Sequence, residues 1–278
     1  MTTRNPRSQG SAAVMRAASG KVLLWVVLAS AGLTARESPA AERVRTTAGA
    51  DRNTARLLSL AVPPTQEQPS EPVYTVQLGA SFDRASDGER TLSLPFLVSY
   101  APNRWYFEVS GDGYQRVKSG VERSRGLADI ALVVNYTKTF GSSGQYGIVP
   151  ELELDLPTHG EVGSSRMSQV LRLTLSGAFG PWGLDMAGAV SRDGETPEAD
   201  VSRYSRSVAA KVSYEWKRNM LAALQVKRVT QSGAPGKTVW RGEFDYPIKA
   251  KLTGIVSLGY SHADSSTRSI GFDLAYAF

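Results

Sequence analysis

The chain has 278 residues, no cysteine, two histidines and a formal net charge of +6, from 32 Lys and Arg against 26 Asp and Glu. The lack of cysteine excludes disulfides, thiolate metal sites and a cysteine nucleophile, and two histidines leave little material for a histidine-based site. Five basic residues and one acidic residue lie in the first 40 positions, so the remainder carries about +2 and its charge gives no argument for nucleic-acid binding.

Residues 1–40 are typical of an export signal. A basic lead precedes an apolar run at 22–33 (VLLWVVLASAGL), and small residues at 38–40 offer a cleavage site. The run is too short to span a bilayer as a helix, which needs roughly 20 apolar residues. We therefore expect a signal peptide over 1–40, with Met15 as an alternative start.

The segment from 41 to 72 is polar, carries prolines and has almost no periodicity. Such a composition cannot bury enough apolar surface to fold alone. We expect a disordered periplasmic lead, or a plug that enters the domain that follows.

From residue 73 onward, short segments with a period of two alternate with clusters of Gly, Asn, Asp, Ser and Pro. That pattern predicts strands. There are about twelve, with 10 to 14 open: 73–84, 90–100, 103–114, 127–140, 146–156, 168–179, 182–192, 206–217, 219–230, 238–248, 251–262 and 267–278. Most are long enough for a tilted transmembrane strand, which takes about 9 to 11 residues.

The connections between these segments alternate in length. Those after odd-numbered segments are long or polar, such as QRVKSGVERSRG, PTHGEVGSSRM and TQSGAPGKT, whereas those after even-numbered segments are mostly tight. Long loops at one end and short turns at the other are typical of a bacterial outer-membrane barrel. We therefore predict an all-β fold, an antiparallel transmembrane β-barrel over 73–278 located in the outer membrane.

The two faces of the segments differ in polarity. One face is apolar, as in Leu171, Leu173 and Leu175, and the other is charged. In a membrane barrel the charged face would line the lumen. The lumen-lining candidates are Glu108, Asp129, Glu151, Glu153, Asp155, Arg172, Lys211, Glu215, Lys227, Arg241, Glu243 and Asp245.

Large aromatic residues lie near the two ends of the segments, as Trp105, Tyr136 and Trp216 do at the short-turn end and Trp240 and Tyr260 do at the other. Two aromatic girdles are typical of a barrel in a bilayer. An unpaired strand edge in hydrocarbon would cost several kcal/mol per polar group, so we expect the last strand to pair with the first.

The final strand resembles the C-terminal signal of outer-membrane barrels, which the barrel-assembly machinery reads. That pattern has a polar residue, a glycine, two spaced hydrophobic residues and a terminal aromatic. The matching residues are Ser269, Gly271, Leu274, Tyr276 and Phe278.

A second resemblance covers roughly residues 126–165. Gly126-Leu-Ala-Asp129 opens the strand IALVVNYTKTF, and YGIVPELELDLPTHGEVGSS follows. This stretch resembles the family of outer-membrane transporters often labelled as MetA-pathway phenol-degradation proteins, in which a glycine-aspartate strand start precedes a strand ending Leu-Pro-Thr-Gly. Here Ala128 stands where a second glycine is common, and His159 separates Thr158 from Gly160. The resemblance implies a transporter and an aromatic or organic solute.

Three clusters allow a different interpretation. Glu151, Glu153 and Asp155 could hold a cation or act as acid and base, although charges of both signs on nearly every strand favour a lumen wall.

Ser261-His262, beside Asp264, offers the side chains that a hydrolase would need, but adjacent strand residues point to opposite faces. The basic residues at 116–125 and the mixed charges at 192–206 could contact lipopolysaccharide phosphates, attract a solute or be simply solvated.

Together these patterns predict a channel or transporter that passes a small solute passively through a charged lumen, with no enzymatic activity, cofactor, metal or nucleic-acid partner. Its expected partners are outer-membrane lipid and lipopolysaccharide, the barrel-assembly machinery and the solute. The main alternative is a non-conducting barrel that acts as an anchor, adhesin or sensor through its outer loops, and a membrane hydrolase is a third possibility. Solute, lumen opening and oligomeric state stay open.

Overall fold

A computed structural model describes residues 72–141, 145–159, 161–164, 166–194, 203–216, 220–263 and 265–278. The expected signal peptide and residues 41–71 of the expected lead lie outside the described residues. No helix able to cross a membrane occurs in the described part of the chain.

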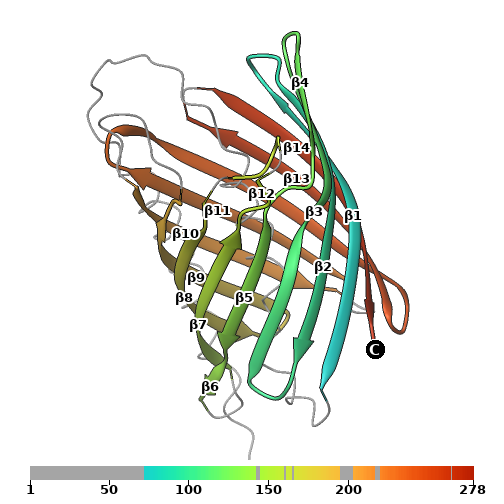
Figure 1. The fold of residues 1–278 in the computed structure, drawn as a ribbon. Coiled ribbons are helices and arrows are strands. Elements are labelled where there is room, and N and C mark those ends of the chain that lie inside the picture. The colour runs from blue at the N-terminus through green and yellow to red at the C-terminus, as the bar shows by residue number, and fades with distance from the viewer. Residues whose placement is uncertain are drawn as a thin grey trace, which may run out of the picture. The chain divides into compact units, whose positions relative to one another are not determined.

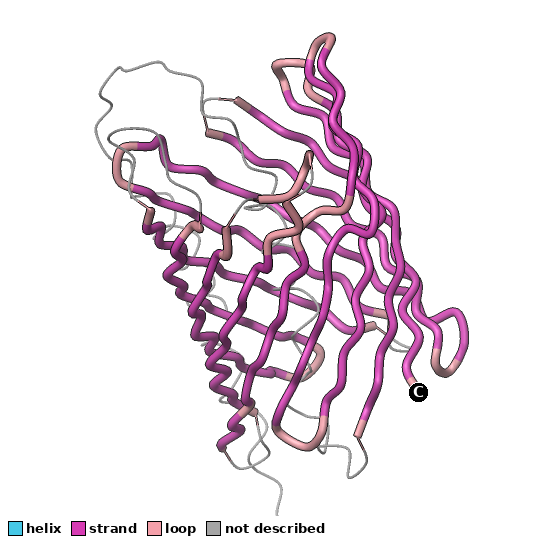
Figure 2. Tube along the Cα trace, viewed as in Figure 1, coloured by secondary structure: helices cyan, strands magenta, loops and turns pink. Residues whose placement is uncertain are grey.

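The described elements are all strands, drawn in magenta in Figure 2, and none of the described segments there has the cyan of a helix. Their bounds are β1 Val73–Ala85, β2 Arg90–Ala101, β3 Trp105–Ser119, β4 Glu122–Gly126, β5 Ile130–Tyr136, β6 Lys138–Phe140, β7 Tyr146–Leu156, β8 Ser168–Phe179, β9 Trp182–Arg192, β10 Tyr204–Glu215, β11 Leu221–Gln231, β12 Ala234–Lys249, β13 Leu252–His262 and β14 Ser266–Ala277.

The sheet closes on itself as a barrel (Figure 1). Each strand pairs antiparallel with its neighbours, and β1 pairs with both β2 and β14, with Thr75 opposite Ala277 and Ala85 opposite Thr267. β4, β5 and β6 follow one another along a single crossing, since β4 and β5 both pair with β3 while β5 and β6 both pair with β7. The barrel therefore has twelve strands, which confirms the predicted fold class.

Side chains alternate between the two faces of this sheet. On β8, for example, Leu171, Leu173 and Leu175 are exposed, and Val170 and Arg172 on the alternate positions are buried. The arrangement inverts that of a water-soluble protein. The exposed side is rich in Leu, Val and aromatic residues, and the buried residues include seventeen polar or charged ones.

Two segments expected as loops are instead hairpins. Residues 115–126 form the end of β3 and all of β4, which pair from Gln115–Gly126 to Ser119–Glu122, and Figure 1 shows this hairpin at the loop end of the barrel. The stretch TQSGAPGKT holds a two-residue turn between β11 and β12, with Gly233 at φ 82°. Glycine adopts that conformation without steric cost. The turn is therefore tight, and the polar residues on either side of it belong to β11 and β12.

The segment predicted as one strand from 127 to 140 is interrupted at 127–129 and at Thr137. Asp129 explains the first break, because its Oδ1 accepts hydrogen bonds from the backbone N–H groups of Thr158 (3.3 Å) and Ser164 (2.8 Å). Thr158 Oγ1 also donates to the Leu127 carbonyl at 3.0 Å. The loop after β7 is thereby tied to the junction of β4 and β5.

Candidate functional site

The inner face of the barrel carries most of the charged groups of the strands. Ten acidic and five basic residues within the described strands have side chains that are buried or half-buried. They are Asp83, Glu108, Asp112, Glu151, Glu153, Asp155, Asp185, Glu243, Asp245 and Asp273 with Arg172, Lys211, Lys227, Lys237 and Arg241. The face therefore combines both signs with an excess of carboxylates.

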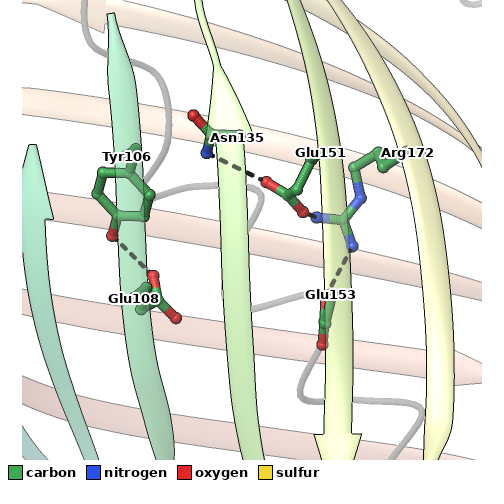
Figure 3. Close-up of polar contacts among 6 residues, drawn as sticks. All are labelled: Tyr106, Glu108, Asn135, Glu151, Glu153 and Arg172. Atoms are coloured by element: carbon green, nitrogen blue, oxygen red, sulfur yellow. Dashed lines mark hydrogen bonds and ion pairs between the residues drawn. The ribbon is translucent and has the colours of Figure 1, made fainter. Parts of the chain in front are cut away.

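One polar cluster on this face is built around Arg172 on β8. Its guanidinium forms an ion pair with Glu151 through Nη1 and lies 3.6 Å from Glu153 Oε2 through Nη2, and all three side chains are buried (Figure 3). Asn135 Nδ2 on β5 donates to Glu151 Oε2 at 3.5 Å. Arg172 lies directly opposite Glu151 in the β7–β8 register, which is why one guanidinium can serve both carboxylates.

The same wall continues onto β3, where the Tyr106 hydroxyl donates to Glu108 Oε2 at 2.7 Å (Figure 3). Tyr106 and Asn135 are opposite each other in the β3–β5 register. Hydrogen bonds to a charged partner are stronger than neutral ones. This wall is thus a set of carboxylates held in place by fixed donors.

A second polar group lies on β9 to β12. Lys211 Nζ is 2.8 Å from Asp185 Oδ2, and Arg241 Nη2 is 3.8 Å from Glu243 Oε2. Gln225 lies between Lys211 and Arg241 in the register of these strands. Three buried atoms of this group accept or donate no hydrogen bond among the described residues: Gln225 Oε1, Arg241 Nε and Asp245 Oδ1.

Ten of the twelve lumen-lining candidates are buried or half-buried on the inner face, and the other two, Asp129 and Glu215, lie at strand ends. Asp129 lies between β4 and β5, where it binds loop amides. Glu215 is exposed at the end of β10. Asp129 continues the parity of the inner residues of β5 but lies outside the paired strand, whereas Glu215 is still paired with Leu221 and lies at the open end of the inner face.

Sequence reasoning missed several inner-face residues. Asp112 is buried on β3, two positions beyond Ser110 and four beyond Glu108, and Asp83 lies on the inner side of β1. Counting by twos from Glu108 would have found Asp112. The roles of Tyr106 and Asn135 as donors depend on the register between β3, β5 and β7, for which the sequence carries no signal.

Ser261, His262 and His159 lie on β13 and in the loop after β7. Ser261 is buried and the adjacent His262 is exposed, so the two side chains lie on opposite faces of β13. His159 is exposed in the loop after β7. Among the described residues no group of three or more His, Cys, Asp or Glu side chains is placed to hold a metal ion.

Aromatic rings gather on the outer face near the short-turn end. Tyr74 stacks on Tyr100 at 4.7 Å between ring centroids, Trp105 lies 5.1 Å from Tyr136, and Trp182 lies 4.6 Å from Tyr214. Amphipathic rings settle at the boundary between hydrocarbon and water. Closed antiparallel barrels with such an outer face are the transmembrane barrels of bacterial outer membranes, and that is the location of this barrel.

The final strand ends beside the start of β1. The Phe278 backbone N–H donates to the Tyr74 carbonyl at 2.9 Å, and the ring of Phe278 contacts that of Tyr276 edge to face at 4.8 Å. Gly271 is buried, whereas Leu274 and Tyr276 are exposed, and Ser269 is half-buried. The role of these five residues as an assembly signal stays a prediction.

Comparisons with solved structures show what this fold is similar to. An outer membrane channel from Pseudomonas putida F1 matches with a TM-score of 0.60 and 12% identity, over 74% of this chain and 95% of that one. The NanC porin matches with a TM-score of 0.55 and 12% identity, over 72% and 98% of the two chains. The KdgM porin matches with a TM-score of 0.51 and 12% identity, over 73% and 99%.

At this identity the likeness concerns the fold, and each of these three proteins is covered almost completely by the matching part of this chain. No model of a known family matches the sequence. No curated protein matches it either. The resemblance of residues 126–165 to the phenol-degradation family therefore stays a prediction.

Proposed function

We propose that the chain is a passive outer-membrane channel for a small hydrophilic solute. The observation that carries this proposal is the polarity of the two faces: a closed barrel has an apolar outside and fifteen buried or half-buried charged residues on its inner strand positions. A barrel that served only as a membrane anchor could fill its interior with apolar side chains, at no cost in buried charge. Similarity of the fold to a bacterial outer membrane channel and to two porins supports the same function.

The solute would be small because several side chains on the inner face have almost no solvent-exposed surface. Glu153 and Gln225 are each 1% exposed, and Glu108 and Lys211 are each 3% exposed. It would be hydrophilic because the buried side chains of the described strands are mostly polar, while the large aromatic residues, Tyr106 excepted, lie on the outer face. This interior gives no support to the aromatic solute that the family label implies.

The test is conductance of the purified full-length protein in planar lipid bilayers. We expect discrete, small conductance steps in potassium chloride, because ions pass through any water-filled path lined by fixed charges. Reconstitution without protein is the blank, and a heat-dependent shift in gel mobility shows that the protein used is folded. Folded protein that gives no steps at any voltage would contradict the channel.

The near-complete burial of the inner charged groups favours one other function, a non-conducting barrel that acts through its outer loops. In that case the β3–β4 hairpin, which carries an exposed Val121 at its turn, would be the contact element. Silent bilayers together with a binding partner that is lost on removal of residues 117–124 would support this alternative over the channel.

A further inference from the structure

Five basic side chains lie next to one another across five strands, on the outer face at the loop end of the barrel. The register pairs Arg123 with Lys118, Lys118 with Arg90, Arg90 with Arg84, and Arg84 with Arg268. These residues come from β4, β3, β2, β1 and β14, all five are exposed, and we call them the basic row. The row is continuous only in the closed barrel, because β1 and β14 meet in it.

The basic row lies at the edge of the apolar surface. Two positions along β1, β2 and β14 toward the middle of the barrel are Phe82, Leu92 and Ile270, which are 42%, 42% and 39% exposed. They form the next cross-strand row, since Phe82 is opposite both Leu92 and Ile270. One strand repeat of two residues is about 7 Å, so the basic row lies where hydrocarbon gives way to the head groups of a bilayer.

The arrangement is unfavourable for the isolated protein. Directly opposed side chains on an antiparallel pair have Cβ atoms about 5 Å apart, and like charges at such positions destabilise the sheet. Among the carboxylates whose side chains the structure describes, none forms an ion pair with these five side chains. Glu89, which precedes Arg90 in the sequence, has its pKa raised by burial and then by Asp87, whereas a guanidinium partner would lower it.

We propose that the basic row is a binding site for the phosphate groups of lipopolysaccharide in the outer leaflet. Guanidinium groups match phosphate oxygens in geometry and bind them by charge-assisted hydrogen bonds. A row of cations at head-group level faces the phosphates of the lipid whose chains contact Phe82 and Leu92. Arg116 and Arg125, which oppose each other beside Leu92, extend the cationic surface on the same side.

The experiment measures binding of fluorescently labelled lipopolysaccharide to the folded full-length protein in a zwitterionic detergent. Wild type is compared with the triple variant Arg84→Gln, Arg90→Gln, Arg268→Gln and with a control of equal charge change at the short-turn end, Lys138→Gln, Lys249→Gln, Lys251→Gln, whose residues are also exposed. We expect at least tenfold weaker binding for the row variant, less than twofold change for the control, and weaker binding by wild type as salt increases.

Two further measurements test the role of the phosphate groups and the folding of the row variant. Enzymatically dephosphorylated lipopolysaccharide should bind wild type about as weakly as the row variant binds the intact lipid. In detergent alone the row variant should unfold at the same temperature as wild type or a higher one, because its mutual repulsion is reduced. Unchanged binding by the row variant, equal binding of the dephosphorylated lipid, or a lower unfolding temperature in detergent would each overturn the site.

Discussion

Arg172 shows how a charged residue can be stable inside a membrane protein. Its side chain is 2% exposed and contacts two carboxylates that are equally buried, Glu151 and Glu153. Transfer of a lone guanidinium to such a place would cost several kcal/mol, and the two anions and the Asn135 amide offset that cost together. The cluster is therefore one unit, and each member depends on the others.

We expect Arg172→Gln to destabilise the barrel by about 3–5 kcal/mol, because it leaves two neighbouring carboxylates without their cation in a water-poor place. The free energy of unfolding in urea, measured on the protein in detergent micelles, checks this. Arg192→Gln, which removes an exposed arginine at the end of β9, serves as the control and should change stability by less than about 0.5 kcal/mol.

Adding Glu151→Gln to Arg172→Gln should recover part of the lost stability, since it removes one of the two buried carboxylates that the loss of Arg172 leaves without a cation. A double-mutant cycle would then give a coupling energy well above the few tenths of a kcal/mol seen for independent sites. Purely additive losses would show that the guanidinium and the carboxylate act separately.

At the scale of elements, the break between β4 and β5 fixes the loop that follows β7. Asp129 accepts two loop amides, and Arg125 N donates to Glu161 Oε2 at 3.1 Å on the other side of the break. Gly163 lies so close that an added Cβ would clash with Thr158 Oγ1 and come within 2.9 Å of Asp129 Oδ1. The interruption of the strand therefore has a structural purpose, which is to hold a loop at the barrel end.

We predict that Asp129→Ala and Gly163→Ala each release this loop while leaving the barrel assembled. The first removes the acceptor, and the second forces the loop away by steric overlap. Amide hydrogen exchange at Thr158 and Ser164 should become at least tenfold faster in both variants. Gly188→Ala is the matched control, because nothing lies within 4 Å of an added Cβ there. Unchanged protection in Asp129→Ala would show that the carboxylate does not hold the loop.

At the scale of the whole molecule, the charge balance of the inner face sets the ion preference that a channel would show. The described strands place ten acidic and five basic residues on inner positions that are buried or half-buried. Fixed carboxylates raise the local concentration of cations, and the effect is strong where low-dielectric walls focus the field. We therefore predict cation over anion selectivity, measured as the reversal potential across a salt gradient.

Glu243→Gln with Asp245→Asn should reduce this selectivity, since it removes two of the inner carboxylates, and Arg172→Gln should increase it. The matched control is Asp87→Asn with Glu161→Gln, which removes the same charge from exposed loops and should leave the reversal potential within a few millivolts. A conducting but anion-selective protein would contradict this charge argument and leave the channel itself intact.

Much of this architecture could be predicted from the sequence. The period of two, the alternating loop lengths and the aromatic residues at both ends predict a barrel, the number of alternating segments predicts twelve strands, and the cost of unpaired edges in hydrocarbon predicts β1–β14 closure. The Asp129 break was not predicted because Ile130 to Tyr136 continues the alternation with no visible interruption. The Arg172 cluster and the basic row depend on which residues face each other across strands, and register comes from the closed structure.

The seam between β1 and β14 also determines the order of events in biogenesis. β1 leaves the ribosome before every other strand of the barrel, yet one of its edges pairs only with β14, the last strand of the barrel, from Thr75–Ala277 to Ala85–Thr267. Until β14 exists, that edge exposes unpaired amides that hydrocarbon cannot accommodate. We therefore expect the strands of the barrel to enter the bilayer together once β14 has been made, and not one by one during synthesis.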